Sequence, residues 1–412
     1  MKLAVTLADI RAAERVIATN VLRTPTLASP RLSALTGARI CVKYENLQAT
    51  GSFKERGAIN KLVSLTDAEK RRGVVAMSAG NHAQAVAYHA NRLGIASTIV
   101  MPEPTPFVKI AATEAYGARV VLHGETVADA ERHAREFVAN EGLILVHPYD
   151  DAMVIAGQGT IAIEMLVDDP ALDMLVVPIG GGGLISGIAT AAKAIKPSIE
   201  VLGVEATLFP SMWNAIKGET RPCEGSTIAE GIAVKNVGQL TEPIIRKLVA
   251  DIILADEGHL ERAVNAFLTL QKTMAEGAGA AGLAAVLASP ERFRGKRVGL
   301  VVCGGNIDPR VAASIMVREL ERDDRIVSYR ISIQDRPGTL GTISTLLGRL
   351  GANILEVHHR RLFLDMPARG ARLDVTVETR DRTHAEAIER ALADKGYTVE
   401  RIDTGAGGFE PV

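Results

Sequence analysis

The sequence is poor in cysteine, with three cysteines among 412 residues, and it lacks long hydrophobic runs. Cys41, Cys223 and Cys303 show no paired spacing, which predicts free thiols in a reducing compartment and therefore a cytoplasmic protein. No apolar run reaches membrane-spanning length, and the N-terminus has neither the apolar core nor the cleavage site of a signal peptide. We therefore expect no association with a membrane.

An excess of charge of either sign is also absent. The 47 Lys and Arg residues nearly balance the 48 Asp and Glu residues, so the net charge is −1. Because nucleic-acid-binding proteins usually carry a basic excess, we expect no nucleic-acid partner. The sequence has no HExxH pair and no cysteine cluster, so a catalytic transition metal is not expected. It also has no P-loop pattern for a nucleotide phosphate.

The pattern that is present is an alternation of helices and strands. From about residue 50 to 320, short continuous apolar runs alternate with helical patterns, which predicts mostly parallel sheets covered by helices on both faces. The predicted fold class is α/β, with two doubly wound sheet units. They form a first region at 1–320, in which a small subdomain at about 50–150 is inserted between 1–49 and 151–320. Residues 1–40 are predicted to be helical, with turns at Pro25 and Pro30.

The remaining residues predict a separate small unit. The run from Arg318 to Arg325 is charged and has no apolar face, which predicts a boundary there and a linker at 321–327. Residues 328–404 show the order strand, helix, strand, strand, helix, strand, which is a βαββαβ ferredoxin-like fold. The second of these strands is predicted at 353–364, and 405–412 are predicted to be a loose tail.

Lys54 lies in the run GSFKERG at residues 51–57. An isolated lysine is usually a solvated surface charge, but the neighbouring Phe53 predicts partial burial. Burial disfavours the ammonium form and lowers a lysine pKa from about 10.4 towards neutrality, which imine formation and proton abstraction both require. Lys54 is therefore a candidate nucleophile and base.

Four consecutive glycines, Gly180, Gly181, Gly182 and Gly183, lie between an apolar strand and a helix. The loop is compatible with a flexible turn, a dinucleotide fingerprint or a phosphate cradle, and its position favours an anion held at the helix N-terminus. The G-x-G-x-x-G spacing fails, because Ile185 or Ser186 occupies the third glycine position. Glu205 nevertheless lies where a ribose-binding acid would, so the dinucleotide interpretation stays open.

A second turn between a strand and a helix carries Ser78, Ala79, Gly80, Asn81 and His82. In one interpretation, Ser78 or Asn81 is only a helix N-cap. In the other, the small residues let backbone amides bind a carboxylate, while Asn81 offers its amide to a ring hydroxyl. From the residues alone, these two interpretations are equally well supported.

Cys303 ends a buried strand and precedes two glycines. Ligands of parallel sheets bind at the carboxyl edge, which is the position of Cys303. A buried cysteine is, however, more often a small inert apolar residue.

These motifs, in this order, resemble the fold-type II pyridoxal 5′-phosphate (PLP) enzymes, which have a tryptophan synthase β-like fold, and specifically the threonine dehydratase and serine racemase/dehydratase group. The resemblance extends from Thr24 to about Asn306. The runs TIAEG at 227–231 and EGAGA at 276–280 support it, although the family more often has Asp at position 230 and Pro at position 277.

The resemblance implies roles for individual residues. Lys54 would hold PLP as a Schiff base and later remove the substrate Cα proton. The phosphate would bind at the four glycines and Leu184, the ring hydroxyl at Asn81, and the pyridine nitrogen at Cys303, with Phe53 beside the ring. The substrate carboxylate would bind to backbone amides of the turn from Ser78 to His82.

The implied reaction is β-elimination of water from L-threonine, giving 2-oxobutanoate and ammonia, with L-serine as a secondary substrate. A neutral Cys303 thiol does not force the ring nitrogen to be protonated, which favours β-elimination over transamination. Racemases of the group have a serine at the position of Ala79, so racemisation should be minor here. Glu205 matches one metal ligand of the racemases, but Ser211 replaces its expected acidic partner, so a Mg²⁺ site is doubtful.

The C-terminal unit resembles an ACT domain, with the run DRPGTL at 335–340 as its first-loop signature. It would serve either for oligomerisation or as a sensor of an amino acid such as isoleucine or valine. The resemblance places that ligand at an interface between two ACT units, beside Asp335, Arg336, Pro337, Gly338, Leu340, Asn353 and Ile354. It also implies a homotetramer and a role in amino-acid metabolism, for which isoleucine biosynthesis and catabolic use both stay open.

Three other functions stay open. The same scaffold could serve a dehydratase that prefers serine or threo-3-hydroxyaspartate. A nicotinamide-dependent oxidoreductase would use the glycine loop for a dinucleotide. A regulatory protein that senses amino acids would need no chemistry at Lys54.

Overall fold

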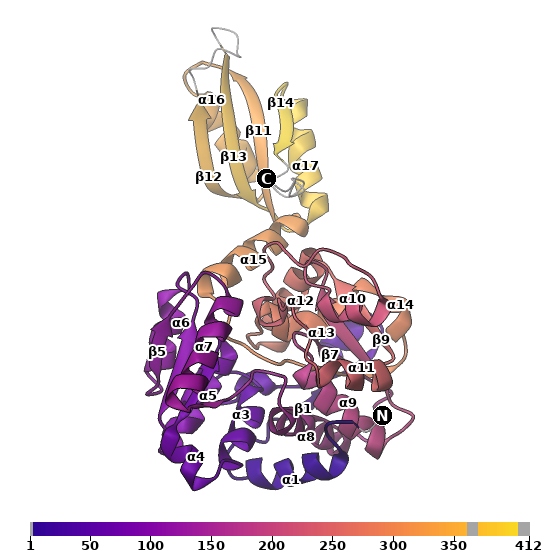
Figure 1. The fold of residues 1–412 in the computed structure, drawn as a ribbon. Helices are drawn as coiled ribbons and strands as arrows, with labels where there is room; N and C mark the ends of the chain where they lie inside the picture. Colours follow the sequence, from indigo (N-terminus) through magenta and orange to yellow (C-terminus); the bar gives the residue numbers. More distant parts are fainter. Residues whose placement is uncertain (1–2, 361–369, 403–412) are drawn as a thin grey trace. The chain divides into compact units, whose positions relative to one another are not determined.

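The computed structural model describes residues 3–360 and 370–402, and the chain divides into two compact units, Met1–Asp308 and Pro309–Val412 (Figure 1). The first unit contains two sheets, and the second contains one. This division lies ahead of the charged run from Arg318 to Arg325, where the sequence predicted a boundary.

The larger sheet of the first unit has six strands in the order β1-β2-β10-β7-β8-β9. Every neighbouring pair is parallel except β1 and β2, which are antiparallel. The central strand β7 is completely buried, as its uninterrupted apolar sequence predicts. The strands are β1 (Thr26–Ala28), β2 (Arg39–Lys43), β7 (Met174–Pro178), β8 (Glu200–Ala206), β9 (Asp251–Ala255) and β10 (Arg297–Val301).

The smaller sheet has four parallel strands in the order β5-β4-β3-β6. Its strands are β3 (Val74–Met77), β4 (Ser97–Met101), β5 (Arg119–Leu122) and β6 (Ile144–Leu145). All of them come from one continuous stretch of chain, whereas the larger sheet takes strands from both sides of that stretch. The two parallel sheets confirm the predicted α/β fold class.

Helices connect the parallel strands, as βαβ units require. They are α1 (Leu7–Ile17), α2 (Pro30–Thr36), α3 (Lys54–Val63), α4 (Asp67–Arg72), α5 (Asn81–Arg92), α6 (Phe107–Glu114), α7 (Val127–Glu141), α8 (Ala152–Asp168), α9 (Gly183–Ile195), α10 (Ser211–Lys217), α11 (Thr241–Leu248), α12 (Glu257–Gln271), α13 (Gly277–Ala288) and α14 (Pro290–Phe293), with short 3₁₀ turns η1 (Glu45–Leu47) and η2 (Glu230–Ile232).

Glycines allow α8 to approach α3 and α9 at backbone contact. A Cβ atom on Gly187 of α9 would lie 2.3 Å from the carbonyl oxygen of Ile155, and one on Gly157 of α8 would lie 2.5 Å from that of Arg56. Both separations are far below van der Waals contact, so any larger residue would push the helices apart. This contact fixes α3, which begins at Lys54, against the centre of the unit.

The prediction for residues 1–40 was wrong in two places. Residues 26–28 form the edge strand β1, and Pro30 begins helix α2 rather than making a turn. The fixed φ of proline suits the first position of a helix, and Ser29 caps this helix by accepting a hydrogen bond from the N–H of Leu32 at 3.2 Å. A three-residue strand is too short to show an alternating pattern.

The second unit is the predicted βαββαβ fold, with an antiparallel sheet in the order β12-β13-β11-β14. Helix α15 begins this unit and precedes the βαββαβ fold. It includes residues 318–322 of the charged run, and Glu319 is buried there. The end of the strand predicted at 353–364 and the predicted tail lie outside the described residues. The elements are α15 (Pro309–Arg322), β11 (Ile326–Gln334), α16 (Thr339–Arg349), β12 (Asn353–Arg360), β13 (Gly370–Glu378), α17 (Arg382–Asp394) and β14 (Thr398–Ile402).

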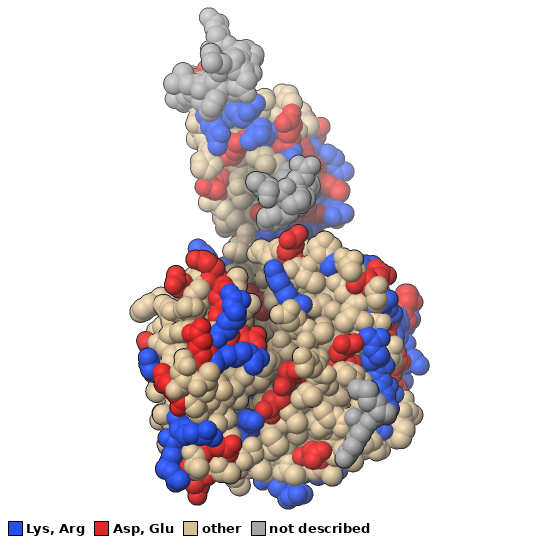
Figure 2. Space-filling model, viewed as in Figure 1, with Lys and Arg blue, Asp and Glu red and all other residues tan. Residues whose placement is uncertain are grey.

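Within residues 3–360 and 370–402, no helix combines the length and the apolar character needed to cross a membrane. On the face drawn in Figure 2, basic and acidic side chains are interspersed on both units. This distribution agrees with the nearly balanced charge of the sequence.

Candidate active site

Lys54 is the first residue of α3, and the chain just after β10 anchors the loop that leads to it. The N–H of Phe53 donates a hydrogen bond to the carbonyl oxygen of Cys303 at 3.0 Å. The Nζ atom of Lys54 donates to the carbonyl oxygen of Pro148 at 2.7 Å and lies 5.2 Å from the centre of the Phe53 ring. The lysine is therefore held at the carboxyl edge of the large sheet, where ligands of parallel sheets bind.

Burial lowers the pKa of Lys54 to about 8, in the direction that the sequence predicted. The groups of Cys303 and Glu276 act in the opposite direction and limit the shift. No carboxylate forms an ion pair with Lys54 among those recorded in the described residues. Its neutral amine is therefore accessible close to physiological pH, which suits a nucleophile and a base.

A network of paired charges lies two residues further along α3. The guanidinium of Arg56 is completely buried and forms two hydrogen bonds to each of the carboxylates of Glu45 and Glu164, at 2.6–2.9 Å. Lys43 adds bonds to Glu164 at 2.5 Å and to the carbonyl oxygen of Thr24 at 2.6 Å. We call Lys43, Glu45, Arg56 and Glu164 the charge network; its two positive and two negative charges balance.

The glycine loop connects β7 to α9 and ends in a conformation that favours glycine, because Gly182 has φ +95°. The first backbone hydrogen bond that closes the helix runs from the N–H of Ser186 to the carbonyl oxygen of Gly182 at 3.0 Å. The amides before Ser186, including that of Leu184, therefore have no carbonyl partner within α9. A Cβ atom on Gly181 would lie 2.3 Å from the ring of Tyr149, so no side chain fits there. These features fit a phosphate group.

The turn from Ser78 to His82 leads from β3 into α5 and lies beside open space. A Cβ atom on Gly80 would meet nothing within 4 Å, and the N–H of Gly80 donates to Oγ of Ser78 at 3.1 Å. His82 has a structural position instead: its Nε2 donates to the carbonyl oxygen of Val146 at 2.8 Å, and burial lowers its pKa to about 3. Only the backbone of His82 is therefore suited to bind a carboxylate.

Asn81 takes part in a chain of three side chains that sequence reasoning missed. Its Nδ2 donates to Oε1 of Glu276 at 2.6 Å, and its Oδ1 accepts from Nδ2 of Asn306 at 2.8 Å. Asn306 also donates to the carbonyl oxygen of Thr50 at 2.8 Å. The one available signal was the position of Glu276, a lone acidic residue directly before the run of small residues that begins α13.

The Cys303 side chain is buried at the end of β10, and its Sγ donates to the carbonyl oxygen of Ala278 at 3.4 Å. Burial, followed by the nearby carboxyl group of Glu276, raises the pKa of the Cys303 thiol. The thiol is therefore neutral at physiological pH. Cys41 and Cys223 are free as well.

Glu205 has a structural role in α10. Its two carboxylate oxygens accept hydrogen bonds from the N–H groups of Met212 and Trp213, both at 2.8 Å. Burial raises the pKa of Glu205 to about 7. In the described ranges 3–360 and 370–402, no three His, Cys, Asp or Glu side chains are grouped so that they could hold a metal ion.

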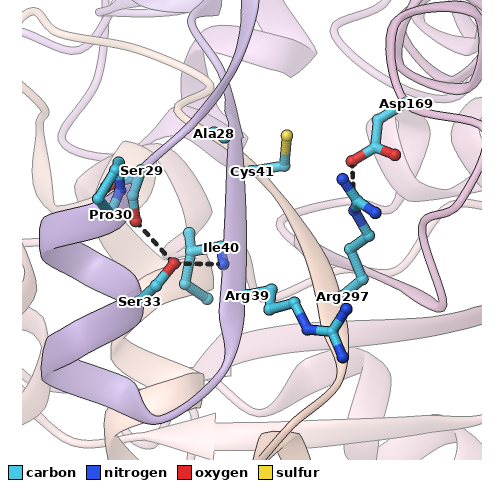
Figure 3. Close-up of a pocket in the computed structure, with 9 residues that line it drawn as sticks. All are labelled: Ala28, Ser29, Pro30, Ser33, Arg39, Ile40, Cys41, Asp169 and Arg297. Atoms are coloured by element: carbon cyan, nitrogen blue, oxygen red, sulfur yellow. Dashed lines mark hydrogen bonds and ion pairs between the residues drawn. The ribbon is translucent and has the colours of Figure 1, made fainter.

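A small cavity of about 210 Å³ lies away from these residues (Figure 3). Arg39 and Arg297 are the first residues of β2 and β10, so the cavity is at the amino edge of the large sheet, opposite to Cys303. Arg297 pairs with Asp169 at 2.9 Å. The cavity lining consists of Ala28, Ser29, Pro30, Ser33, Arg39, Ile40, Cys41, Asp169 and Arg297.

In the second unit, the predicted regulatory residues lie at opposite ends of the sheet. Gln334, which precedes the loop at 335–340, is paired with Gly370 of β13, whereas Asn353 is paired with Glu378 of the same strand. Eight residues of strand separate these ends by roughly 27 Å. The residues from Asp335 to Gly338, Leu340 and Asn353 are exposed, and Ile354 is half-buried.

Comparison with family models agrees with this architecture. Residues 17–304 match the model of the pyridoxal-phosphate dependent enzymes, and residues 330–397 match the ACT domain model. The L-threonine ammonia-lyase of Thermotoga maritima is 43% identical over 400 residues, which cover 97% of this chain and 100% of the relative. The catabolic L-threonine dehydratase of Escherichia coli K12 is 44% identical over 310 residues, which cover 74% of this chain and 94% of the relative.

Solved structures show the same fold. Maize serine racemase superposes with a TM-score of 0.72 at 35% identity, covering 77% of this chain and 99% of that chain. The processed form of threonine deaminase isoform 2 from Solanum lycopersicum superposes with a TM-score of 0.71 at 33% identity, covering 76% of this chain and 86% of that one. The chain therefore belongs to the pyridoxal-phosphate dependent enzyme family and carries a C-terminal ACT domain.

Proposed function

We propose that this protein catalyses β-elimination of water from L-threonine and releases 2-oxobutanoate and ammonia, with L-serine as a secondary substrate. The observation that carries the proposal is that one short segment contacts both the candidate lysine and the candidate phosphate site. The carbonyl oxygen of Pro148 accepts from Lys54, and the next residue, Tyr149, packs on Gly181. The likeness to the Thermotoga L-threonine ammonia-lyase over almost the whole chain supports the choice of substrate.

PLP would be held by residues that follow the carboxyl ends of strands in both sheets of the first unit. The amides of the glycine loop and of Leu184 would bind its phosphate, and Lys54 would bind its aldehyde carbon. Asn81 would donate to the ring oxygen, and the neutral thiol of Cys303 would lie at the ring nitrogen. Bound PLP supplies an electron sink that acidifies the Cα–H bond of an amino acid.

The residues of the chain would then orient the substrate and move its proton. The amides of the turn from Ser78 to His82 would bind the substrate carboxylate at the N-terminus of α5. Lys54, whose burial favours the neutral amine, would accept the Cα proton. Ala79 has no hydroxyl that could return a proton to the opposite face, so elimination is favoured over racemisation. The Cα proton and the β-hydroxyl would together leave as one water molecule, and a second water would hydrolyse the released enamine, as its imine tautomer, to the 2-oxo acid and ammonia.

The proposal is tested with purified protein by recording the visible absorbance of bound PLP and assaying 2-oxo acid with L-threonine, L-serine and threo-3-hydroxyaspartate. We expect a yellow protein with its highest kcat/KM on L-threonine and little D-amino acid product. A yellow protein that acts better on serine or hydroxyaspartate would overturn the choice of substrate. A colourless protein that binds NAD would favour an oxidoreductase, and activity that survives Lys54→Ala would contradict the chemistry.

For the ACT domain, we propose a site for isoleucine or valine that is built from two copies of the chain in a tetramer. The support is geometric, because residues 335–340 and Asn353 lie at opposite ends of one sheet and a single amino acid cannot contact both within one copy. Co-expressed Asp335→Ala and Asn353→Ala chains should therefore recover part of the isoleucine response that each variant loses alone. A response that is lost equally in the mixed protein would contradict a shared site.

We also propose a cytoplasmic location, which the three free cysteines support. Fractionation of cells that produce the protein would test this, and enrichment in a membrane or secreted fraction would contradict it.

A further inference from the structure

The hydrogen bonds of Asn81 fix which way its amide faces. Oδ1 accepts from Asn306, and one N–H of Nδ2 donates to Glu276. A flipped amide would set an N–H against the donor of Asn306 and an oxygen against the carboxyl group of Glu276, at the cost of both bonds. In the observed orientation, one N–H of Nδ2 is bonded to Glu276, and no acceptor is recorded for the other among residues 3–360 and 370–402.

Glu276 has little freedom to move away from Asn81. A Cβ atom on Gly304 would lie 2.2 Å from Oε1 of Glu276 and 2.9 Å from Nδ2 of Asn81, so the backbone of Gly304 lies directly against this pair. The N–H of Glu276 also donates to the carbonyl oxygen of Gly304 at 3.1 Å. The carboxyl group is thus held in place from α13 and from the chain that follows β10.

We propose that Glu276 is a positioning residue for the cofactor: it holds the Asn81 amide in one orientation and so keeps an N–H available for the cofactor ring. This inference rests on the proposed function, because it assumes that Asn81 contacts PLP. The role requires no direct contact between Glu276 and PLP or substrate.

A second consequence concerns charge. Burial raises the pKa of Glu276 to about 7, although its bond to Asn81 favours the ionised form. Lys109 of α6 and Lys54 of α3 also favour ionisation, whereas Glu230 of η2 opposes it. The neutral amide of Asn81 and the neutral thiol of Cys303 also lie near the carboxyl group. As the pH rises through neutrality, Glu276 gains a negative charge that favours the ammonium form of Lys54.

Two substitutions separate these effects. Glu276→Gln keeps an acceptor for Asn81 but cannot ionise, whereas Glu276→Ala removes both the acceptor and the charge. Equilibrium dialysis of the full-length protein against PLP would measure affinity, and the growth of the visible band after PLP is added to PLP-depleted protein would measure the rate of uptake. Both readouts are independent of turnover.

For positioning, we expect Glu276→Ala to bind PLP about tenfold more weakly than wild type. The PLP affinity of Glu276→Gln should stay within about threefold of the wild-type value. Asn306→Ala removes the other holder of the amide and should weaken binding about fivefold. Thermal melting of each variant checks that the fold is intact. Wild-type affinity in both Glu276→Ala and Asn306→Ala would overturn the positioning role.

For charge, we expect Glu276→Gln to take up PLP at the wild-type rate at pH 6 and up to about twofold faster at pH 8, because loss of the carboxylate favours the neutral amine of Lys54, about half of which is already neutral at that pH. Identical pH profiles in the two proteins would overturn this consequence. If wild-type protein neither binds PLP nor releases 2-oxo acid, the proposed function has failed. If it does both and the variants match it, only the role of Glu276 has failed.

Discussion

Lys54 and Arg56 lie in the first turn of α3, two residues apart, yet their charges have opposite environments. Arg56 is surrounded by carboxylates, and although burial alone would lower its pKa, Glu45 and Glu164 raise it. Lys54 has only a carbonyl oxygen as a hydrogen-bond acceptor, and burial lowers its pKa to about 8. One helix therefore carries one cation that is permanently charged and one that can lose its proton.

The difference shows how a buried charge can serve either stability or chemistry. A charge that is matched by partners on several elements, as that of Arg56 is, holds those elements in place and stays ionised. A charge without a carboxylate partner has an accessible neutral form and can react. The two roles can be separated experimentally by changing each residue alone.

The largest effect should come from Lys54→Ala. We expect 2-oxo acid production to fall by about a thousandfold or more, because the residue that binds the aldehyde and accepts the proton is lost. Stability should not fall, since the substitution removes a poorly solvated ammonium group and only one hydrogen bond. A steady-state assay and a denaturant titration would check both parts, and a large loss of stability would assign Lys54 to the scaffold.

Arg56→Met should have the opposite effect to Lys54→Ala, with its main cost in stability and not in catalysis. The carboxylates of Glu45 and Glu164 would lose their shared partner inside the protein, and we expect the free energy of unfolding to fall by about 3–5 kcal/mol. Urea denaturation would measure it. If Arg56→Met matched wild type in stability and lost only activity, the contrast between the two residues would be wrong.

The pH dependence of PLP uptake gives a smaller and more specific effect. Only the neutral amine of Lys54 attacks an aldehyde, so uptake by PLP-depleted protein should slow about tenfold for each pH unit below about 8. The rate of growth of the visible band between pH 6 and 9 would measure this. A midpoint near the ordinary lysine value of about 10.4 would show that burial does not act on Lys54 as described.

The smallest effect serves as a control for the charge network. Arg11 and Glu14 form an ion pair at 2.9 Å on the surface of α1, and their side chains are 45% and 36% exposed. Arg11→Ala should change the free energy of unfolding by less than about 0.5 kcal/mol, because water already solvates both charges. A cost similar to that of Arg56→Met would mean that burial does not distinguish the two pairs.

The sequence predicted those features that depend on neighbouring residues. The apolar run of β7 followed by the glycine loop predicted a buried strand that leads into a helix, and Phe53 predicted the burial of Lys54. The strand β1 was missed because three residues show no periodicity. Sequence also placed the boundary of the last unit within a helix, since charged residues alone do not show that Glu319 is buried.

The contacts of Asn81 could not be predicted in this way. Asn81 is 195 residues from Glu276 and 225 residues from Asn306 along the chain. They meet because the turn after β3 of the smaller sheet lies beside the chain that follows β10 of the larger sheet. The same applies to the charge network, in which Arg56 and Glu164 come from different helices. Resemblance to a family identified the motifs, but the structure was needed to connect them.

Residues 335–340 and Asn353 lie at opposite ends of the ACT sheet, and this affects both the stoichiometry of ligand binding and its dependence on protein concentration. A site that needs both ends of the sheet exists only between two chains, and it occurs twice in a symmetric pair, so saturation would require one ligand molecule per chain. Such a ligand would also favour association, and its apparent affinity would fall as the protein is diluted. The ACT domain would then report the concentration of the enzyme itself together with that of the amino acid.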